Sequence, residues 1–492
     1  MAQGFHIENF GCRAARADGE AISDVLRSGG LQASDAQNAD VVIVNTCSVT
    51  AEADREARAF IRRAHRLNPA ARILVTGCYA QRAPEEVAAL SGVSAVVGNS
   101  HKALAPEIVN RLAVGTAVES SPVIPLTALT NSGAPIWADD SFAHSFLEEA
   151  QVLPGIQTRP NLKIQEGCSN RCTFCVIPQT RGNSRSLSPE SIFKQVRSFV
   201  SAGGNELVIS GINLGRWGRD LDRAHSLGAP GLDFETWDST TTRYPTLATL
   251  VRTILTKTGL PRLRLSSVEP MDWDADLIAL FRDFPPARLA RHAHLPLQSG
   301  SDAVLRRMHR RYRPWHYVEK AAALAAACGD ELTLGADVMV GFPGESDAEF
   351  AETYELIRAL PFGYLHLFPF SPRPGTRAWA LHQQSPVSAP VVAERMAALR
   401  ALALEKTRSH RASMIGRTFD AITLHTPGAL AAHGRTSALT QNFLPVKLEN
   451  SIPANRLIQV HISGVADDLT LLGTGLGTES DQCYTQGAFL RR

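Results

Sequence analysis

Hydrophobic residues in the first 114 positions recur as short β-branched runs that alternate with amphipathic stretches. The run D-V-V-I-V-N at 40–45 is nearly continuous, which is typical of a strand buried on both faces of a parallel sheet. Shorter runs predict strands at 5–10, 72–76 and 95–97, and helical patterns cover 13–28 and 52–67. This alternation predicts an α/β domain with a parallel sheet over residues 1–114.

The same alternation returns between residues 158 and 387. The stretch 115–157 before it is rich in Ser, Thr and Pro without a sustained period, so we expect a linker there. Residues 217–244 break the alternation and are expected to form an inserted surface loop. Strand patterns separated by helical patterns lie at 162–165, 206–210, 263–266, 294–297, 333–340 and 364–369. About six βα units predict a partial, TIM-like (βα)6 barrel, whose sites lie at the carboxyl ends of its strands.

The C-terminal quarter of the chain has a different pattern. A helical connector is expected within 388–412, followed by a small all-β barrel over 413–475 and a tail at 476–492. The barrel rests on five short β-like runs, at 418–424, 434–438, 443–447, 457–462 and 469–472. The predicted order is therefore a parallel-sheet domain, a partial barrel and a small closed barrel.

Composition narrows the class of protein. Apolar residues make up 44% of the 492 residues, as in ordinary globular proteins. No apolar run approaches the roughly 18 residues needed to span a bilayer, and residues 1–12 lack a signal pattern, so we expect a cytoplasmic protein without a membrane partner. Eight cysteines in such a chain indicate metal or catalysis before disulfides. The net charge of +2 means that any nucleic acid must be held by local basic patches.

Three cysteines lie in one short loop after a predicted strand. Cys168, Cys172 and Cys175 form a C-x3-C-x2-C run, and three thiolates this close converge on one point, as a single iron–sulfur cluster requires. With three ligands for four irons, one iron stays open to chelate a small molecule. Structural zinc is the alternative, but it takes four ligands and usually paired C-x2-C motifs.

Three further cysteines are far apart in the amino-terminal sequence. Cys12, Cys47 and Cys78 each follow the carboxyl end of a predicted strand by one or two residues. In a parallel sheet those ends lie on one edge, where ligands bind. We therefore predict a second three-cysteine cluster, against the alternative of three unrelated core thiols. Cys328 and Cys483 are expected to be structural or incidental.

The loop at Cys168 resembles the radical S-adenosylmethionine enzymes, which have an aromatic residue before the last cysteine, here Phe174. In that superfamily the open iron of a [4Fe-4S] cluster binds S-adenosylmethionine, whose one-electron cleavage releases a 5′-deoxyadenosyl radical. The G-G-N-E stretch resembles the motif that holds the methionyl amino group. The expected S-adenosylmethionine contacts are thus Gly203, Gly204, Glu206, Ser267, Glu269 and Gln298. A simple turn at Gly203-Gly204 and ordinary polar bonding at the barrel rim remain alternatives.

Two further stretches, L-P-L-Q-S-G-S at 295–301 and D-V-M-V-G-F-P-G-E at 337–345, resemble the methylthiotransferase branch of that superfamily. Within it, residues 44–58, S-S-V-E-P at 266–270 and H-R-R-Y at 309–312 are most like enzymes acting on N6-threonylcarbamoyladenosine at position 37 of tRNA. The resemblance implies methylthiolation of C2 of that base with two [4Fe-4S] clusters and no catalytic residue beyond their ligands. Alternatives are N6-isopentenyladenosine in tRNA, an aspartate of a ribosomal protein, and a non-catalytic iron–sulfur RNA-binding protein.

The resemblance also implies partners. These are the tRNA anticodon loop and an electron donor such as flavodoxin or ferredoxin, whereas the sulfur donor stays unknown. The small C-terminal barrel is similar to the RNA-binding TRAM domain, although a barrel that only docks on its neighbour is the alternative. Two basic stretches suit RNA contact or a solvated helix face equally, namely Arg55, Arg58 and Arg62 on one helix and the Arg-rich run 305–315.

Overall fold

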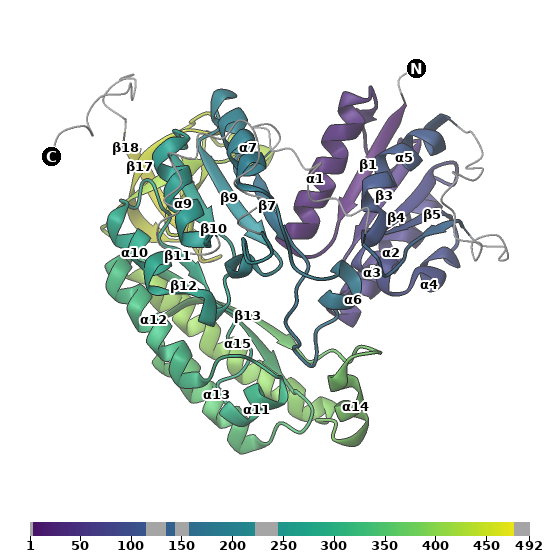
Figure 1. Ribbon diagram of the computed structural model, residues 1–492. Coiled ribbons are helices and arrows are strands. Elements are labelled where there is room, and N and C mark those ends of the chain that lie inside the picture. Colours follow the sequence, from purple (N-terminus) through teal and green to yellow (C-terminus); the bar gives the residue numbers. More distant parts are fainter. Residues whose placement is uncertain (1–2, 115–133, 143–156, 222–244, 477–492) are drawn as a thin grey trace.

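The computed structural model describes residues 3–114, 134–142, 157–221 and 245–476. These residues form an amino-terminal α/β domain, a central partial barrel and a small C-terminal barrel (Figure 1). The amino-terminal domain, purple to blue, lies to one side of the central barrel, teal to green. None of the helices in the described part of the chain combines the length and apolar character needed to cross a membrane.

The amino-terminal domain is a six-stranded parallel sheet in the order β2-β1-β3-β4-β5-β6. Its strands are β1 (Gly4–Asn9), β2 (Gln32–Ala33), β3 (Val41–Thr46), β4 (Arg72–Gly77), β5 (Val93–Gly98) and β6 (Ile136–Trp137). Its helices are α1 (Arg13–Ser28), α2 (Ala51–Leu67), α3 (Cys78–Arg82), α4 (Pro84–Ala88), the 3-10 helix η1 (Asn99–Leu104) and α5 (Ala105–Val114). This architecture confirms the predicted parallel-sheet domain.

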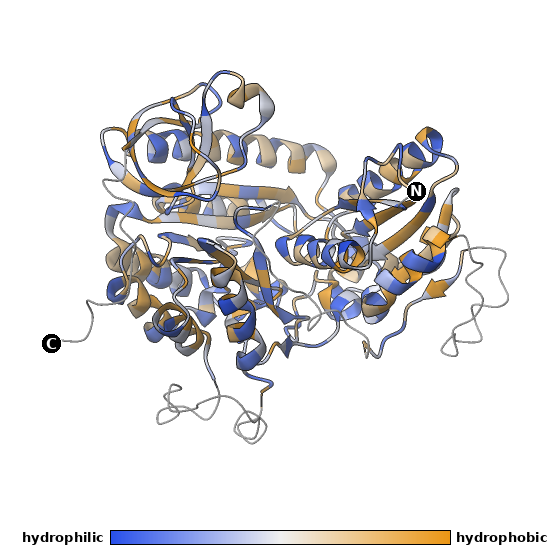
Figure 2. Ribbon diagram, turned by 90° about the horizontal axis from the view of Figure 1, so that it is seen from above, coloured by the Kyte–Doolittle hydropathy of each residue, from blue (hydrophilic) through white to orange (hydrophobic). Residues whose placement is uncertain are grey.

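Strand β3 is buried along its whole length because helices cover both faces of the sheet. Val41 and Ile43 pack into one apolar cluster with residues of α1 and α5, whereas Val42 and Val44 pack into another with residues of α2 and α4. The strands of this sheet are orange between helices with blue faces in Figure 2. The alternation of side chains across a strand thus explains why the β-branched run was uninterrupted.

Part of the expected linker is sheet. Residues 134–142 lie within the predicted 115–157 linker, yet Ile136–Trp137 pairs with β5 as an edge strand and Trp137 is buried in the core. Two residues are too few to show a period in the sequence. The rest of that stretch lies outside the described residues.

The central barrel is built from six parallel strands, β7 (Asn161–Glu166), β9 (Glu206–Gly211), β10 (Arg262–Leu265), β11 (His292–His294), β12 (Thr333–Val340) and β13 (Phe362–Pro369). These strands form two sheets, in the orders β10-β9-β7-β8 and β11-β12-β13. The first sheet includes the short strand β8 (Arg185–Ser186), which pairs antiparallel with β7. Isolated bridges at Leu263–Leu289 and Ser267–His294 join the two sheets. This confirms the predicted partial barrel.

Helices connect these strands on the outside of the barrel. They are α6 (Ile177–Arg181), α7 (Pro189–Ser201), α9 (Leu247–Lys257), α10 (Ala275–Asp283), α11 (Asp302–Arg307), α12 (Pro314–Cys328), α13 (Asp347–Ala359) and α14 (Arg377–Gln384). Short 3-10 turns are η3 (Leu214–Arg216), η5 (Pro270–Asp272) and η6 (Gly329–Glu331). Within the expected loop at 217–244, residues 222–244 lie outside the described residues. Trp217, by contrast, is buried in the core, and its indole N–H donates a hydrogen bond of 2.9 Å to the Leu187 carbonyl.

The long helix α15 (Ala389–Ala412) leads into a closed five-stranded barrel, as predicted. Its elements are β14 (Thr418–Thr423), α16 (Gly428–Ala431), β15 (Thr436–Thr440), β16 (Pro445–Leu448), β17 (Leu457–Val465) and β18 (Leu471–Leu476). Phe443, between β15 and β16, packs against His292 of the central barrel, with ring centroids 4.3 Å apart and an angle of 31° between the ring planes. The small barrel therefore closes the end of the central barrel where β11 begins.

Candidate functional site

The loop after β7 brings Cys168, Cys172 and Cys175 together at the carboxyl end of the strand. Burial is the main reason that the pKa of Cys175 is raised to about 12, and the charges of Cys172 and Cys168 add to it. A bound metal supplies the positive charge that turns such a thiol into a thiolate. The donor set therefore fits an iron–sulfur cluster held by three ligands.

Nitrogen donors surround these sulfur atoms. The Asn170 amide N–H lies 3.4 Å from Cys168 Sγ, and Asn213 Nδ2 lies 3.5 Å from the same atom. Arg310 Nη1 lies 3.4 Å from Cys172 Sγ. Donors aimed at sulfur stabilise metal-bound thiolates and tune the metal, which is a second observation that fits a cluster at this loop.

The amino-terminal cysteines also converge. Strands β1, β3 and β4 end at one edge, since Asn9 pairs with Asn45 and Thr46 pairs with Gly77. Burial raises the pKa of Cys47 to about 12, and the charges of Cys78 and Cys12 raise it as well. Asn99 Nδ2 lies 3.4 Å from Cys78 Sγ. The structure thus brings Cys12, Cys47 and Cys78 together, and they fit a second three-ligand cluster.

A short helix connects the two cysteine sites. Helix α6 begins two residues after Cys175 and ends at Arg181. The Thr180 carbonyl accepts a hydrogen bond of 2.8 Å from Asn99 Nδ2, the amide that also faces Cys78. Five helical residues span about 8 Å at ~1.5 Å per residue. The two sites are therefore linked across the boundary between the domains by this helix and by the hydrogen bond of its Thr180 carbonyl to Asn99.

A buried ion network crosses the same boundary. Asp18 of α1 pairs with Lys102 at 2.9 Å, with Arg181 at 3.2 Å and with Lys163 of β7. Glu166, at the end of β7, pairs with Lys163 and Arg181, each at 2.5 Å. The charges of Cys78 and Cys12 also help to raise the pKa of Arg181 well above its usual value. The network fixes Arg181 beside the amino-terminal cysteines.

The structure does not bring Gly203, Gly204 and Glu206 to the cysteine loop. Glu206 begins β9 and pairs in register with Arg262, at the amino ends of the strands, whereas Cys168 follows the carboxyl end of β7. The Glu206 carboxylate also forms ion pairs with three arginines: with Arg264 at 2.9 Å, and with Arg159 and Arg262 at 3.4 Å. The expected contact of these three residues with S-adenosylmethionine is therefore corrected: a Gly-Gly-x-Glu pattern before a strand is here a turn and a structural ion cluster.

Ser267, Glu269 and Gln298 lie after strands at the other end of the barrel. Glu269 accepts a hydrogen bond from Arg310, the residue that faces Cys172, and both line a small cavity with Cys172. Gln298 has a φ of 62° and its buried Oε1 has no partner among the described residues. Ser267 bridges to His294. These positions are compatible with the expected cofactor contacts, which stay a prediction.

Sequence reasoning missed several polar residues at this end of the barrel. Asn213 follows β9 in an S-G-I-N stretch, and its position after a strand was the signal that could have found it. A second group consists of His294, Asp337 and His366, on three adjacent strands. Asp337 lies 3.1 Å from His294 Nε2 and 3.2 Å from His366 Nδ1, and hydrogen bonds from these rings keep the pKa of Asp337 below its usual value despite its burial.

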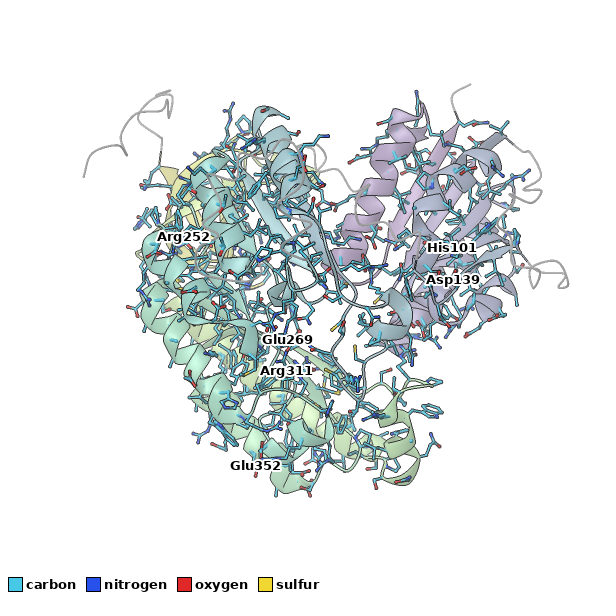
Figure 3. All side chains as sticks on the ribbon, in the orientation of Figure 1. His101, Asp139, Arg252, Glu269, Arg311 and Glu352 are labelled. Carbon is cyan, nitrogen blue, oxygen red and sulfur yellow. The ribbon has the colours of Figure 1, made fainter. Side chains whose placement is uncertain are left out.

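A basic cavity of about 670 Å³ opens beside the cysteine loop. Figure 3 labels Arg311, which lines both this cavity and the smaller one, and Glu269, which lines the smaller one, near the centre of the molecule. The lining comes from the cysteine loop, from Ser184 between α6 and β8, and from the two segments that follow β9 and α11. It comprises Ser169, Asn170, Arg171, Ser184, Asn213, Arg216, Arg219, Asp220, His309, Arg310, Arg311 and Arg313.

Two family descriptions match the chain. Residues 4–98 match the family described as "Uncharacterized protein family UPF0004", and residues 162–357 match the "Radical SAM superfamily". The first match ends with β5, and the second runs from β7 to α13. Each therefore covers one of the two three-cysteine sites.

Named relatives are similar over most of their length. A "Threonylcarbamoyladenosine tRNA methylthiotransferase MtaB" of Bacillus subtilis is 35% identical over 77% of this chain and 76% of its own. Another of that name, from Aquifex aeolicus, is 31% identical over 93% and 99%. A "tRNA-2-methylthio-N(6)-dimethylallyladenosine synthase" of Lawsonia intracellularis is 31% identical over 85% and 86%. Two substrate names thus occur at comparable identity.

Among solved structures, the radical S-adenosylmethionine methyltransferase TsrM of Kitasatospora setae superimposes with a TM-score of 0.51. The match covers 77% of this chain and 74% of that one, at 14% sequence identity. At this identity the likeness shows a shared fold.

Proposed function

This chain belongs to the radical S-adenosylmethionine tRNA methylthiotransferase family, and we propose that it methylthiolates C2 of N6-threonylcarbamoyladenosine at position 37 of tRNA. The family makes it an enzyme that uses a [4Fe-4S] cluster and S-adenosylmethionine. The proposal adds a second cluster, the substrate base and the residues that hold each group. Cys168, Cys172 and Cys175 are assigned to one cluster, and Cys12, Cys47 and Cys78 to the other.

The observation that carries this proposal is the pair of three-cysteine sites joined by α6. When bound, the two clusters and two molecules of S-adenosylmethionine would supply what replacement of an unactivated aromatic C–H bond by a methylthio group requires: a 5′-deoxyadenosyl radical that removes the hydrogen atom, a sulfur atom, and a methyl group. The residues of this chain hold these groups close together. Thr180 and Asn99 fix the spacing between the sites, and Asn213 and Arg310 direct donors at the sulfurs of the cysteine loop.

The charge of the cavity beside the loop supports the threonylcarbamoyl substrate. That substituent carries a carboxylate, whereas the dimethylallyl group of the alternative substrate is an apolar hydrocarbon. A cavity lined by six arginines offers charge-assisted hydrogen bonds to the first substituent, whereas the second has no group that could accept them. The names of the relatives from Bacillus subtilis and Aquifex aeolicus point to the same substrate.

The proposal includes the division of labour along the chain. The cluster-binding domain spans 1–114, a linker 115–157, the radical domain 158–387, a connector 388–412, and a TRAM-like barrel 413–475 before the tail. The strand at 136–137 adds to the sheet of the cluster-binding domain. The small barrel is proposed to bind the anticodon arm, and a flavodoxin or ferredoxin to supply electrons in the cytoplasm.

The test is a single-turnover assay with anaerobically reconstituted enzyme and tRNA bearing either threonylcarbamoyladenosine or isopentenyladenosine. Mass spectrometry of the nucleosides should detect the methylthio product only from the first tRNA. Cys168→Ala should abolish both reductive cleavage of S-adenosylmethionine and the product. Cys47→Ala should keep the cleavage and lose the product, because it leaves the radical site intact.

Cys328→Ala on α12 is the matched control, since Cys328 lies outside both sites, and it should keep both reactions. Product formation by Cys47→Ala would refute a sulfur-donating role for the amino-terminal site. A methylthio product from the isopentenyladenosine tRNA alone would replace the proposed substrate by the alternative one.

A further inference from the structure

Among the described residues that line the basic cavity or pair with its lining, positive charges outnumber negative ones. Six arginines line it, and the carboxylates that line it or pair with those arginines are four: Asp220, Asp272, Glu269 and Asp302. Asp272 is shared, because Arg216 lies 2.9 Å from it and Arg219 lies 3.5 Å from it. Asp220 is occupied by the backbone N–H and hydroxyl of Ser186. The cavity therefore keeps an excess of cationic groups.

Two of the arginines supply this excess. Arg171 lies within the cysteine loop and Arg311 follows α11, both are exposed, and neither forms an ion pair with a residue of the described ranges. Arg310, by contrast, is buried, paired with Glu269 and turned to Cys172. Arg310 thus belongs to the cluster side of the cavity, and Arg171 and Arg311 remain available to an incoming anion.

We propose that Arg171 and Arg311 bind the carboxylate of the N6 substituent and so select the threonylcarbamoyl form of the base. The inference rests on the proposed function, since it assumes that this base enters beside the cysteine loop. C2 belongs to the same six-membered ring as C6, the atom that carries N6, so the substituent stays next to the loop while C2 reacts. The substituent ends in a carboxylate, and guanidinium groups bind carboxylates through paired hydrogen bonds.

Under this proposal, the enzyme discriminates against a substituent that leaves the two arginines without an anionic partner. An isopentenyl group entering the same cavity would displace water from the arginines without offering them a partner, which is costly. A phosphate of the RNA backbone is the other anion that could reach these arginines. The two sources differ in one respect: a backbone phosphate is present whatever the base carries.

The experiment compares one tRNA in two forms, with the threonyl carboxylate free or converted to its methyl ester. Steady-state methylthiolation, with inorganic sulfide, a chemical reductant and S-adenosylmethionine in excess, is measured for the wild-type enzyme, for Arg311→Gln and for Arg171→Gln combined with Arg311→Gln. For the free acid, the single variant should lower kcat/KM about ten- to a hundredfold, mostly through KM, since one charged hydrogen bond is lost. For the ester, wild type and variants should differ less than about threefold.

Arg306→Gln is the matched control, because Arg306 is exposed on α11, pairs with Asp302 at 2.8 Å and lies outside the cavity lining. Iron content and melting temperature establish that each variant is folded and loaded. Equal losses on acid and ester would assign the arginines to backbone phosphate and overturn the inference, as would no loss on either. A wild-type enzyme that modifies only isopentenyladenosine tRNA would instead overturn the proposed function.

Discussion

At the scale of single residues, the amino-terminal cysteine site depends on a position without a side chain. Gly11 precedes Cys12 and has a φ of +95°, a region that residues with a Cβ rarely adopt. A Cβ placed there would lie 2.4 Å from Cys47 Cβ and 2.6 Å from Cys47 Sγ. Any larger residue at this position would therefore displace Cys47 or Cys12.

We predict that Gly11→Ala selectively impairs the amino-terminal site. Reconstituted enzyme should lose about half of its iron, because one of two clusters fails to assemble, while reductive cleavage of S-adenosylmethionine continues. Gly30→Ala is the control: Gly30 has a similar φ of +92°, but a Cβ there meets nothing within 4 Å. Full iron content in Gly11→Ala would show that the close approach is not needed to assemble the site.

The carboxylate of Glu20 predicts a pH dependence of stability. Burial raises its pKa from 4.5 to about 7, although Arg16 opposes the shift and Gln157 donates a hydrogen bond to it. The folded state therefore binds this proton more tightly than the unfolded state. The stabilisation is complete below pH 4.5 and is lost as the pH rises through 7.

Glu20→Gln should remove this dependence, because the amide keeps the shape without ionising. At pH 8 the variant should be more stable than wild type by on the order of 1–3 kcal/mol, and at pH 5 the two should converge. Urea unfolding at both pH values measures the difference. An unchanged difference between pH 5 and 8 would mean that Glu20 does not ionise in this range.

The residue scale also shows where sequence reasoning stops. The convergence of six cysteines into two groups could be predicted because thiols that follow strand ends come to lie at one edge of a parallel sheet, whereas their role as cluster ligands stays a proposal. Glu206 was misassigned because a glycine pair and a carboxylate look alike at either end of a strand. Only the strand register shows at which end of a strand such a carboxylate lies. It places Glu206 beside Arg262 at the amino end, whereas Asn213 lies at the carboxyl end, near Cys168.

At the scale of elements, long periodic segments were predictable and short ones were not. Helix α1 was predicted with the observed bounds, and β3 was shifted by one residue, since sixteen residues of helical period or six of β-branched character leave little ambiguity. Helix α6 has five residues and β6 has two, so neither shows a period. Yet α6 sets the spacing of the two cysteine sites, through a hydrogen bond to Asn99 that no local pattern reveals.

The arginines of α2 illustrate the same limit. Arg55 pairs with Glu52 one turn away, and Arg58 contacts Tyr79 and Glu86. Two of the three residues of the predicted basic face thus have partners within the domain. These pairs favour a solvated helix face for α2 over contact with RNA. The run at 305–315, which lines the basic cavity, is then the better candidate for substrate contact.

At the scale of the whole molecule, the relative position of the two domains depends on buried charge. Asp18 and Glu166 neutralise two of three cations, Lys102, Lys163 and Arg181, and all five groups are buried. Nearby opposite charges hold the pKa of Asp18 well below its usual value in spite of burial. The remaining positive charge faces Cys78 and Cys12, so thiolates at that site would complete the balance.

We therefore predict that Asp18→Asn destabilises the enzyme by about 3–5 kcal/mol, because removing one partner leaves buried cations without compensation. The loss should appear in urea unfolding and as faster proteolysis between the domains. Asp24→Asn on the same helix is the control, since its ion pair with Arg27 is partly exposed and should contribute less than about 1 kcal/mol. If Asp18→Asn were as stable as Asp24→Asn, domain docking would have to rest on apolar packing, and the spacing of the two cysteine sites would not depend on this network.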